Sequence, residues 1–329
     1  MRYLAAAALS LALAAPAATA VNAQQVVRVG SIQSEDFYMN PFMDRFFEIV
    51  NERTDNAYEF RVFYNSVLGA DAEMFEQLQA GTLELMLGYS AIRGNWLPAM
   101  EVIGLPGLLS DFDEVQQILN GEIGEDLAEE FREETGVRIL WFLDQAYRNV
   151  FLNDVEVNSI ADLEGVRIRA PDSQLYMAVL NALGANPTPM PFPEIYTAVR
   201  TGVVSGHEQE TPGVIAMRFY EVENVGVVTE HLYQSALWEM SDQFFQSLPE
   251  DHQQIFIDAA REAGEWFRPM TGDVAEAEAR EYLIENHGFT FVELDRDALS
   301  EIYAEMAEDY AQQRGISDWV DRIRAELGK

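Results

Sequence analysis

Two periodicities of apolar residues follow one another along the first third of the chain. Helical spacing places Phe42, Phe46 and Val50 on one face of a segment at 41–54, whereas the stretch 58–64 alternates with the period of a strand. The expected elements are a strand at 26–30, a helix at 41–54, a strand at 58–64, a helix at 72–80 and a strand at 83–88. This βαβαβ order predicts a mostly parallel sheet covered by helices.

The same rhythm returns between residues 166 and 206. It predicts strands at 166–169, 188–190 and 203–206, with helices at 173–183 and 193–201 between them. Neither unit contains a phosphate-binding loop, because the glycines at 202 and 206 have the wrong spacing and no helix opens behind them. We therefore expect the α/β class and a two-lobed architecture with a cleft between the lobes.

The N-terminus has the order of a secretory signal peptide. Arg2 precedes an apolar run at 4–15, and the small-residue cleavage patterns Ala18-Thr19-Ala20 and Val21-Asn22-Ala23 follow. A buried N-terminal helix is the alternative, but the run has no polar face. We expect residues 1–23 to direct export to the periplasm. No later stretch reaches the ~18 consecutive apolar residues of a membrane span.

The composition excludes several partners and chemistries. The formal net charge is −35, and of 21 basic residues all but Lys329 are arginine. Such a field repels nucleic acid and anionic lipid, so an anionic ligand must be held by a specific local arginine. The chain has no cysteine, and its four histidines are not spaced for a metal site. We expect no nucleic-acid partner, no metal and no cofactor.

Motifs of catalysis are missing as well. The sequence has no G-x-S-x-G elbow and no H-E-x-x-H pair. Among 56 acidic residues, a chance pair of carboxylates carries no weight. We therefore expect a binding protein and not an enzyme, with a secreted hydrolase that uses an acid pair as the weakest alternative.

One short motif points to a ligand. In Gly165–Asp172, alternation places Arg167 and Arg169 on one face of a strand that Pro171 ends, so Arg169 lies near the carboxyl end. Open α/β sheets bind ligands beyond the carboxyl ends of their strands. A guanidinium there offers a planar fork of donors that fits a carboxylate. A structural salt bridge, easily supplied in so acidic a chain, is the alternative.

Longer runs of the sequence resemble a known family. The runs are Ile168–Pro171, Ala182–Phe192, Glu194–Ala198, Thr201–Val204 and Phe219–Val222, with Leu68–Gly69, Glu76–Leu78, Gly81–Leu83 and Leu105–Pro106 upstream. Together they are similar to the solute-binding proteins of tripartite ATP-independent periplasmic (TRAP) transporters, in the dicarboxylate-type branch. The likeness covers essentially the whole chain after the leader, and the combination is specific although no single motif is.

The resemblance implies a set of ligand-binding positions. Arg169 matches the family's bidentate carboxylate anchor, and Arg148 matches an arginine that often assists it, although a hinge salt bridge is an equal reading of Arg148. Gln209 stands where the family commonly has asparagine. Asp172 either competes with the ligand for Arg169 or accepts a ligand hydroxyl. The other matching cleft positions are Phe192, Tyr89, Gln33 and Trp238, and both Phe192 and Trp238 could instead be ordinary core.

The resemblance also implies a two-lobed periplasmic binding protein fold, with a ligand cleft between the lobes and a long kinked helix crossing both. Helical periodicity runs from about 247 to 286, and Pro269 gives a reason for the kink. We expect the chain to cross near residues 145, 235 and 272. Lobe I would comprise 24–145 plus 235–272, and lobe II 146–234 plus 273–329.

The expected function follows from these features. A monomeric periplasmic protein would capture a small organic acid and pass it, unchanged, to the membrane permease subunits of a TRAP transporter. C4-dicarboxylates, sugar acids and other monocarboxylates all fit an arginine anchor. The alternatives are a binding protein of an ATP-driven importer and a protein that presents its ligand to a sensor.

Overall fold

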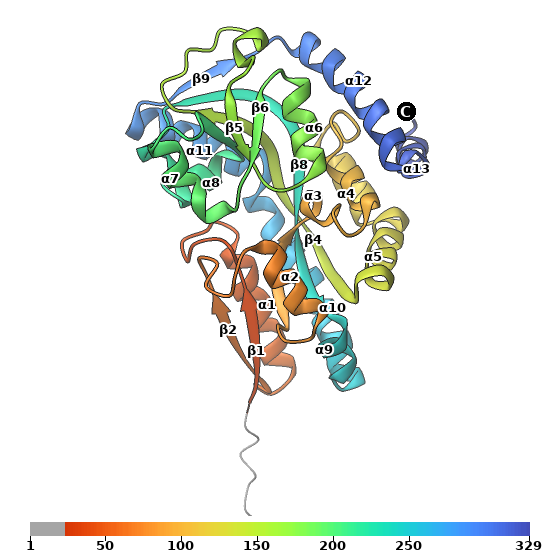
Figure 1. Cartoon of the computed structure of the whole chain (residues 1–329). Coiled ribbons are helices and arrows are strands. Elements are labelled where there is room, and N and C mark those ends of the chain that lie inside the picture. The colour runs from red at the N-terminus through yellow and green to blue at the C-terminus, as the bar shows by residue number, and fades with distance from the viewer. Residues whose placement is uncertain (1–23) are drawn as a thin grey trace, which may run out of the picture.

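One mixed sheet runs through the whole molecule. The computed structural model describes residues 24–329, so the predicted signal peptide at 1–23 lies outside the described residues. The strand order is β2-β1-β3-β8-β4-β7-β5-β6, and β9 pairs with β8. Helices cover the sheet on both faces (Figure 1), which confirms the α/β class. Within residues 24–329, no helix is long and apolar enough to cross a membrane.

The N-terminal βαβαβ unit forms where the apolar pattern placed it. Its parallel strands and their connecting helices are β1 (Gln25–Gly30), α1 (Asn40–Arg53), β2 (Tyr58–Phe63), α2 (Asp71–Gln79) and β3 (Leu85–Tyr89). Helix α1 buries Phe42, Phe46 and Val50, the face that the helical spacing predicted. Burial of this face stabilises α1, because a helix of this length is only marginally stable when isolated in water and depends on packing against the rest of the protein.

The second unit repeats this arrangement with one shift. Its parallel strands are β5 (Arg167–Ala170), β6 (Asn186–Pro189) and β7 (Gly206–Gln209), joined by α6 (Gln174–Ala182), η3 (Phe192–Glu194) and α7 (Ile195–Arg200). The last strand begins at Gly206 and not at 203, because residues 201–205 form turns. A Cβ on Gly206 would lie 1.9 Å from the backbone oxygen of Phe151, so this close strand contact requires glycine.

Two long strands join the units. β4 (Val137–Leu152) and β8 (Val225–Ser241) pair antiparallel, with β8 also bonded to β3 and β4 to β7. Their register shifts at three places, between Ile139 and Trp141, between Asp144 and Ala146, and between Arg148 and Val150. The connecting helices are α3 (Ser90–Arg93), η1 (Pro98–Gly104), α4 (Phe112–Leu119), α5 (Glu122–Thr135), η2 (Ile160–Leu163), α8 (Thr211–Ala216), η4 (Phe219–Glu221) and α9 (Asp242–Ser247).

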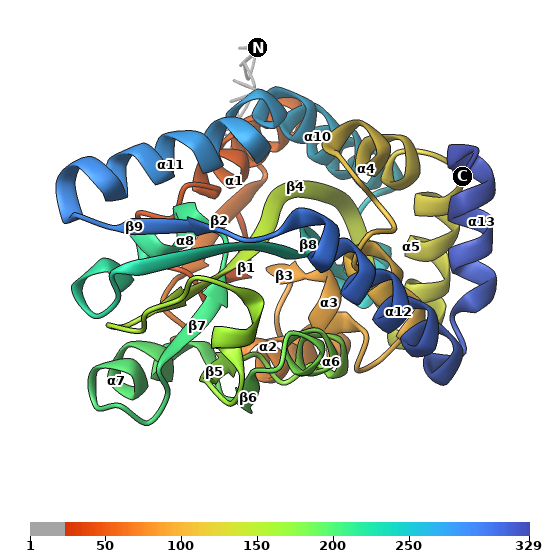
Figure 2. The ribbon, with the colours of Figure 1, turned by 90° about the horizontal axis from the view of Figure 1, so that it is seen from above.

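The expected long helix is kinked in its middle. α10 (Glu250–Phe267) and α11 (Gly272–His287) are separated by the turn η5 (Arg268–Met270). Pro269 lacks the N–H that a continuing helix needs, and Gly272 has a φ of +63°. α10 packs on α1 and α11 on α8, while both contact β4. Figure 2 shows α10 and α11 along one side of the β4–β8 ribbon and α2 and α6 on the other.

The C-terminal segment contacts both halves of the molecule. β9 (Thr290–Glu293) extends the sheet beside β8, α12 (Arg296–Arg314) packs on α6, and α13 (Ser317–Leu327) packs on α4 and η1. Arg314 forms an ion pair with the buried Glu101 at 2.7 Å. Residues 273–329 therefore do not contact the second half alone, although the expected lobe boundaries assign them to it.

Candidate functional site

A cavity of about 410 Å³ opens between the two α/β units. The residues around it follow the carboxyl ends of parallel strands in both units, which is where open α/β sheets bind ligands. The ribbon of β4 and β8 forms its floor. The cavity is lined by Ile32, Gln33, Ala70, Asp71, Ala72, Tyr89, Ile92, Asn95, Gln145, Arg148, Arg169, Pro171, Asp172, Tyr176, Pro189, Met190, Pro191, Phe192, Pro193, Gln209 and Gln234.

Arg169 is buried at this cavity without a carboxylate partner. It lies on β5 between the buried Ile168 and Ala170, and only 3% of it is exposed. Its Nε donates to the Met190 backbone oxygen at 2.9 Å, and its guanidinium stands 5.8 Å from the Phe192 ring centroid. Among residues 24–329 no acidic side chain forms an ion pair with it. Burial therefore lowers the pKa of Arg169 to about 10.

Arg148, in contrast, is enclosed by carboxylates. Its Nε donates to Glu208 at 2.5 Å and its Nη1 donates to Glu210 at 3.0 Å, with all three side chains buried. Burial opposes the ionisation of Glu208, but Arg148 and His231 lower the pKa of Glu208 to about 2. Burial raises the pKa of Glu210 to about 7 in spite of Arg148. Arg148 lines the cavity, yet its charge is already neutralised by the salt bridges that the sequence allowed as an alternative.

Two amides at the cavity each keep one free polar atom. The Oε1 of Gln209 accepts from Arg148 Nη2 at 3.0 Å, which leaves Gln209 Nε2 as a buried donor without a partner among residues 24–329. The Nε2 of Gln33 donates to the Tyr89 hydroxyl at 2.6 Å, and Gln33 Oε1 is a buried acceptor that likewise has no partner in the described part of the chain. Buried polar atoms are normally hydrogen-bonded, so these two are suited to contact a ligand.

Phe192 and Asp172 border the cavity from the second unit. Phe192 is half-buried in η3 beside Arg169, as expected for a wall residue. Asp172 is exposed, and it forms no ion pair with Arg169 in the described part of the chain. Its backbone oxygen accepts from Asn95 Nδ2 at 2.7 Å, a contact between the two units at the cavity.

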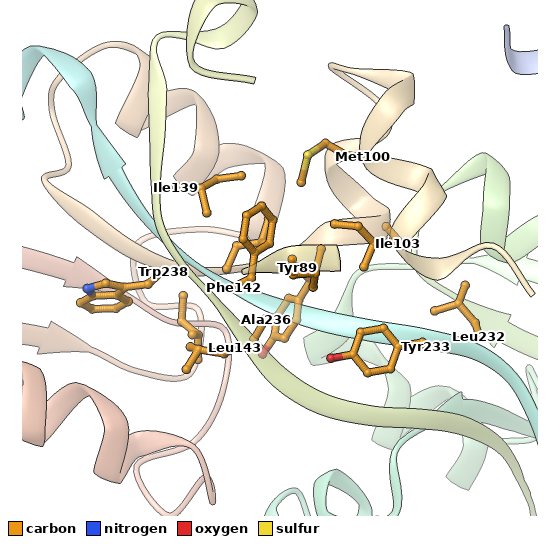
Figure 3. Close-up of a cluster of buried hydrophobic side chains, with 14 of the residues drawn as sticks. Tyr89, Met100, Ile103, Ile139, Phe142, Leu143, Leu232, Tyr233, Ala236 and Trp238 are labelled. Atoms are coloured by element: carbon orange, nitrogen blue, oxygen red, sulfur yellow. The ribbon is translucent and has the colours of Figure 1, made fainter. Parts of the chain in front are cut away.

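Trp238 does not lie at the cavity, so the expectation that it closes the cleft is wrong. It is fully buried on β8 and does not line the cavity. Its ring packs edge-on against Phe46 at 5.2 Å and Phe42 at 5.5 Å, both on α1. Figure 3 shows the Trp238 ring apart from that of Tyr89, which does line the cavity. Trp238 therefore has the core role that the sequence left open.

Sequence reasoning missed three polar residues of the cavity. Gln145 on β4, Gln234 on β8 and Tyr176 on α6 are all buried there. The two glutamines gave no distinctive signal, because each lies in a strand that holds several other polar residues. Their partners are distant in sequence and could not be inferred. In residues 24–329, no group of three or more side chains could hold a metal ion.

Comparisons with known proteins agree with this geometry. The family model described as bacterial extracellular solute-binding protein, family 7, matches residues 29–315. A solute-binding protein of Verminephrobacter eiseniae is 31% identical over 240 residues, which are 73% of this chain and 71% of that protein. The chain therefore belongs to this family, as the resemblance predicted, and it is a solute-binding protein and not an enzyme.

Solved structures show the same fold. A TRAP periplasmic solute-binding protein from Desulfovibrio salexigens with bound orotic acid has a TM-score of 0.86 at 26% identity, covering 93% of this chain and 99% of that one. One from Sulfitobacter with bound β-D-galacturonate has a TM-score of 0.85 at 27% identity, covering 92% and 100%. The two-lobed TRAP binding-protein fold is thereby confirmed.

Proposed function

We propose that this solute-binding protein captures a small organic acid at Arg169 and delivers it, in the periplasm, to the membrane subunits of a TRAP transporter. The observation that carries the proposal is a buried guanidinium that has no carboxylate partner among the described residues, in a chain whose formal net charge is −35. With 56 acidic residues available, a purely structural arginine would readily find a partner.

The energetics favour an anionic ligand at this position. A buried charge without a partner is costly, and a carboxylate that accepts from both terminal nitrogens would remove most of that cost. Charge-assisted bidentate bonds of this kind are among the strongest hydrogen bonds in proteins. Nε of Arg169 is held by the Met190 oxygen, so the terminal nitrogens are fixed in orientation. The related proteins with bound galacturonate and orotic acid support an acid as ligand.

The ligand would bridge two lobes. We propose that residues 24–145 and 235–272 form one lobe and residues 146–234 and 273–329 the other, with α13 resting on the first. Gln33 and Tyr89 come from the first, while Arg169, Phe192, Gln209 and Asp172 come from the second. A ligand bound between them favours the closed state by as much as its affinity for the two states differs. The closed monomer would then be the form that the permease recognises.

A thermal-shift screen over organic acids tests the proposal. A ligand at about 100 times its Kd adds about 2.7 kcal/mol to the free energy of unfolding. We expect at least one monocarboxylate or dicarboxylate to raise the Tm, and neutral sugars of similar size to leave it unchanged. A screen in which neutral solutes and not acids stabilise the protein would contradict the proposal. Delivery to the transporter is tested by measuring uptake of the identified acid in a strain that lacks this protein, where we expect uptake to be lost.

A further inference from the structure

We propose that the natural ligand carries a single carboxylate on a compact, mostly apolar body, and that dicarboxylates and polyhydroxylated sugar acids bind more weakly. This inference rests on the proposed function, since it takes the cavity at Arg169 as the ligand site. It distinguishes this chain from its relative with bound galacturonate.

The cavity offers one surplus positive charge. Arg148 is paired with Glu208 and Glu210. The net charge of these three side chains is zero when Glu210 holds a proton and −1 when it does not, so the cluster offers no positive charge to a ligand. His231 adjoins Glu208, and burial lowers the pKa of His231, which favours its neutral form. Among the described residues that line the cavity, only Arg169 remains for an anion. A second carboxylate would find no further cation there, because the other charged lining residues are Asp172 and Asp71, which is paired with the buried Arg93.

Most polar side chains of the cavity are already bonded to one another. Gln145 Nε2 donates to Glu210 at 2.7 Å, and Gln234 Nε2 donates to Gln145 Oε1 at 2.7 Å. Gln234 Oε1 accepts from Arg148 Nη1 at 3.1 Å and also from the Tyr176 hydroxyl. These groups keep only their second N–H or lone pair for a ligand hydroxyl. A hydroxyl that displaced one of the existing bonds would gain little, because it would leave a buried polar atom without a partner.

The polar atoms that remain free are few and specific. Arg169 and Gln209 Nε2 are donors, which suit a carboxylate, and they lie on β5 and β7, two strands that pair. Gln33 Oε1 and Asp71 Oδ2 are acceptors on the facing unit, which suit a hydroxyl or amide donor of the ligand. Asp172 could accept another. A hexuronate carries a hydroxyl on almost every ring carbon, and the remaining hydroxyls would meet the apolar wall or side chains that are already bonded to one another.

The backbone of the wall beside Arg169 offers few hydrogen-bond donors. Four of its residues are proline, and proline has no N–H to donate. They are Pro171, Pro189, Pro191 and Pro193. Met190 and Phe192 lie between them, and Ile32 and Ile92 face them from the first unit. Burial of an apolar ligand surface against these side chains favours binding, because it removes that surface from water. At about 410 Å³ the cavity is near the lower end of ligand pockets, so the body must be compact.

Three acids built on one six-membered ring test the inference by calorimetry. Cyclohexanecarboxylate has one carboxylate on an apolar ring, trans-cyclohexane-1,4-dicarboxylate adds a second carboxylate, and D-galacturonate replaces the apolar ring by a hydroxylated one. We expect the monoacid to bind about tenfold more tightly, or better, than either of the others. Equal or tighter binding of the diacid or of galacturonate would overturn the inference, as would a lack of binding by all three.

The two proposals fail in different ways. If galacturonate or the diacid binds best and Arg169→Ala abolishes that binding, the proposed function stands and only the ligand class is wrong. If no acid binds in an Arg169-dependent way, the proposed function itself is wrong. Glu210→Gln probes the charge argument at pH 8, where it removes one negative charge beside Arg148. We expect this substitution to reduce the ratio of the monoacid affinity to the diacid affinity about threefold. An unchanged ratio would contradict the claim that the charge of the Arg148 cluster disfavours a second carboxylate.

Discussion

Arg148 on β4 and Arg169 on β5 line the same cavity in opposite electrostatic surroundings. Two buried carboxylates pair with Arg148, while Arg169 has a backbone oxygen and an aromatic face. The first arrangement stabilises the fold and leaves little charge to offer. The second arrangement costs stability and leaves a positive charge for a ligand. Of two identical side chains, Arg148 therefore serves mainly the fold and Arg169 mainly binding.

The two arginines should therefore respond differently to removal. Arg148→Ala leaves Glu208 and Glu210 buried with no counter-charge, and we expect it to lower the free energy of unfolding by about 3–5 kcal/mol. Arg169→Ala removes an unpaired buried charge and should leave stability unchanged or raise it. Urea denaturation of both variants without ligand measures the difference. Equal losses in the two variants would contradict the assignment.

Stability should fall as the pH rises through the neutral range. Burial raises the pKa of Glu210 to about 7, so between its unfolded pKa and pH 7 this group keeps in the folded state a proton that it loses in the unfolded state. The buried Glu239, whose pKa burial also raises to about 7, adds to the same trend. The associated stability is complete below the unfolded pKa and is lost as the pH rises through 7, by up to about 1.4 kcal/mol per pH unit. Thermal unfolding from pH 5 to 8 should show this slope, reduced in Glu210→Gln. Equal slopes in both proteins would rule out Glu210 as the group responsible.

The contact between Asn95 and Asp172 should favour the closed cavity. Asn95 Nδ2 donates to the Asp172 backbone oxygen across the two units, and a hydrogen bond contributes about 0.5–1.5 kcal/mol. Asn95→Ala should weaken ligand binding severalfold with little change in Tm, because Asn95 is exposed at the surface of the first unit. Small-angle scattering should show a larger radius of gyration for the unliganded variant. Unchanged affinity would show that this bond does not help to close the lobes.

Gly206 should tolerate alanine much less well than Gly107 does. At Gly206 a Cβ would meet the Phe151 backbone oxygen at 1.9 Å, and neither strand can move without losing sheet bonds. Gly107 has a φ of +73° but open space around it, so alanine there costs only about 1 kcal/mol of conformational strain. We expect Gly206→Ala to cost more than about 2 kcal/mol. Comparable denaturation midpoints for the two variants would argue against the close contact of β4 and β7.

The apolar periodicity and the prolines of the sequence were sufficient to predict where individual strands and helices begin, end or bend. The alternation of 166–170 and the break at Pro171 place Arg169 at a strand end, and Pro269 places the kink between α10 and α11. The state of Arg148 could not be read in this way, because its partners lie 60 and 62 residues away. The same limit explains Trp238, whose neighbours on α1 are almost 200 residues distant in sequence.

The central claim is that Arg169 anchors the carboxylate of the ligand. The most direct test takes an acid identified by the thermal-shift screen and measures its affinity for Arg169→Ala and Arg167→Ala by calorimetric titration. Arg167 is on the same strand but is exposed, and its Nη2 donates only to the Gly202 backbone oxygen at 2.9 Å, so it is a matched control. We expect Arg167→Ala to bind as the wild type does. Arg169→Ala, folded and of undiminished Tm, should lose about 100-fold or more in affinity, since two charged hydrogen bonds of about 1.5–3 kcal/mol each are removed. Wild-type affinity in Arg169→Ala would contradict the account.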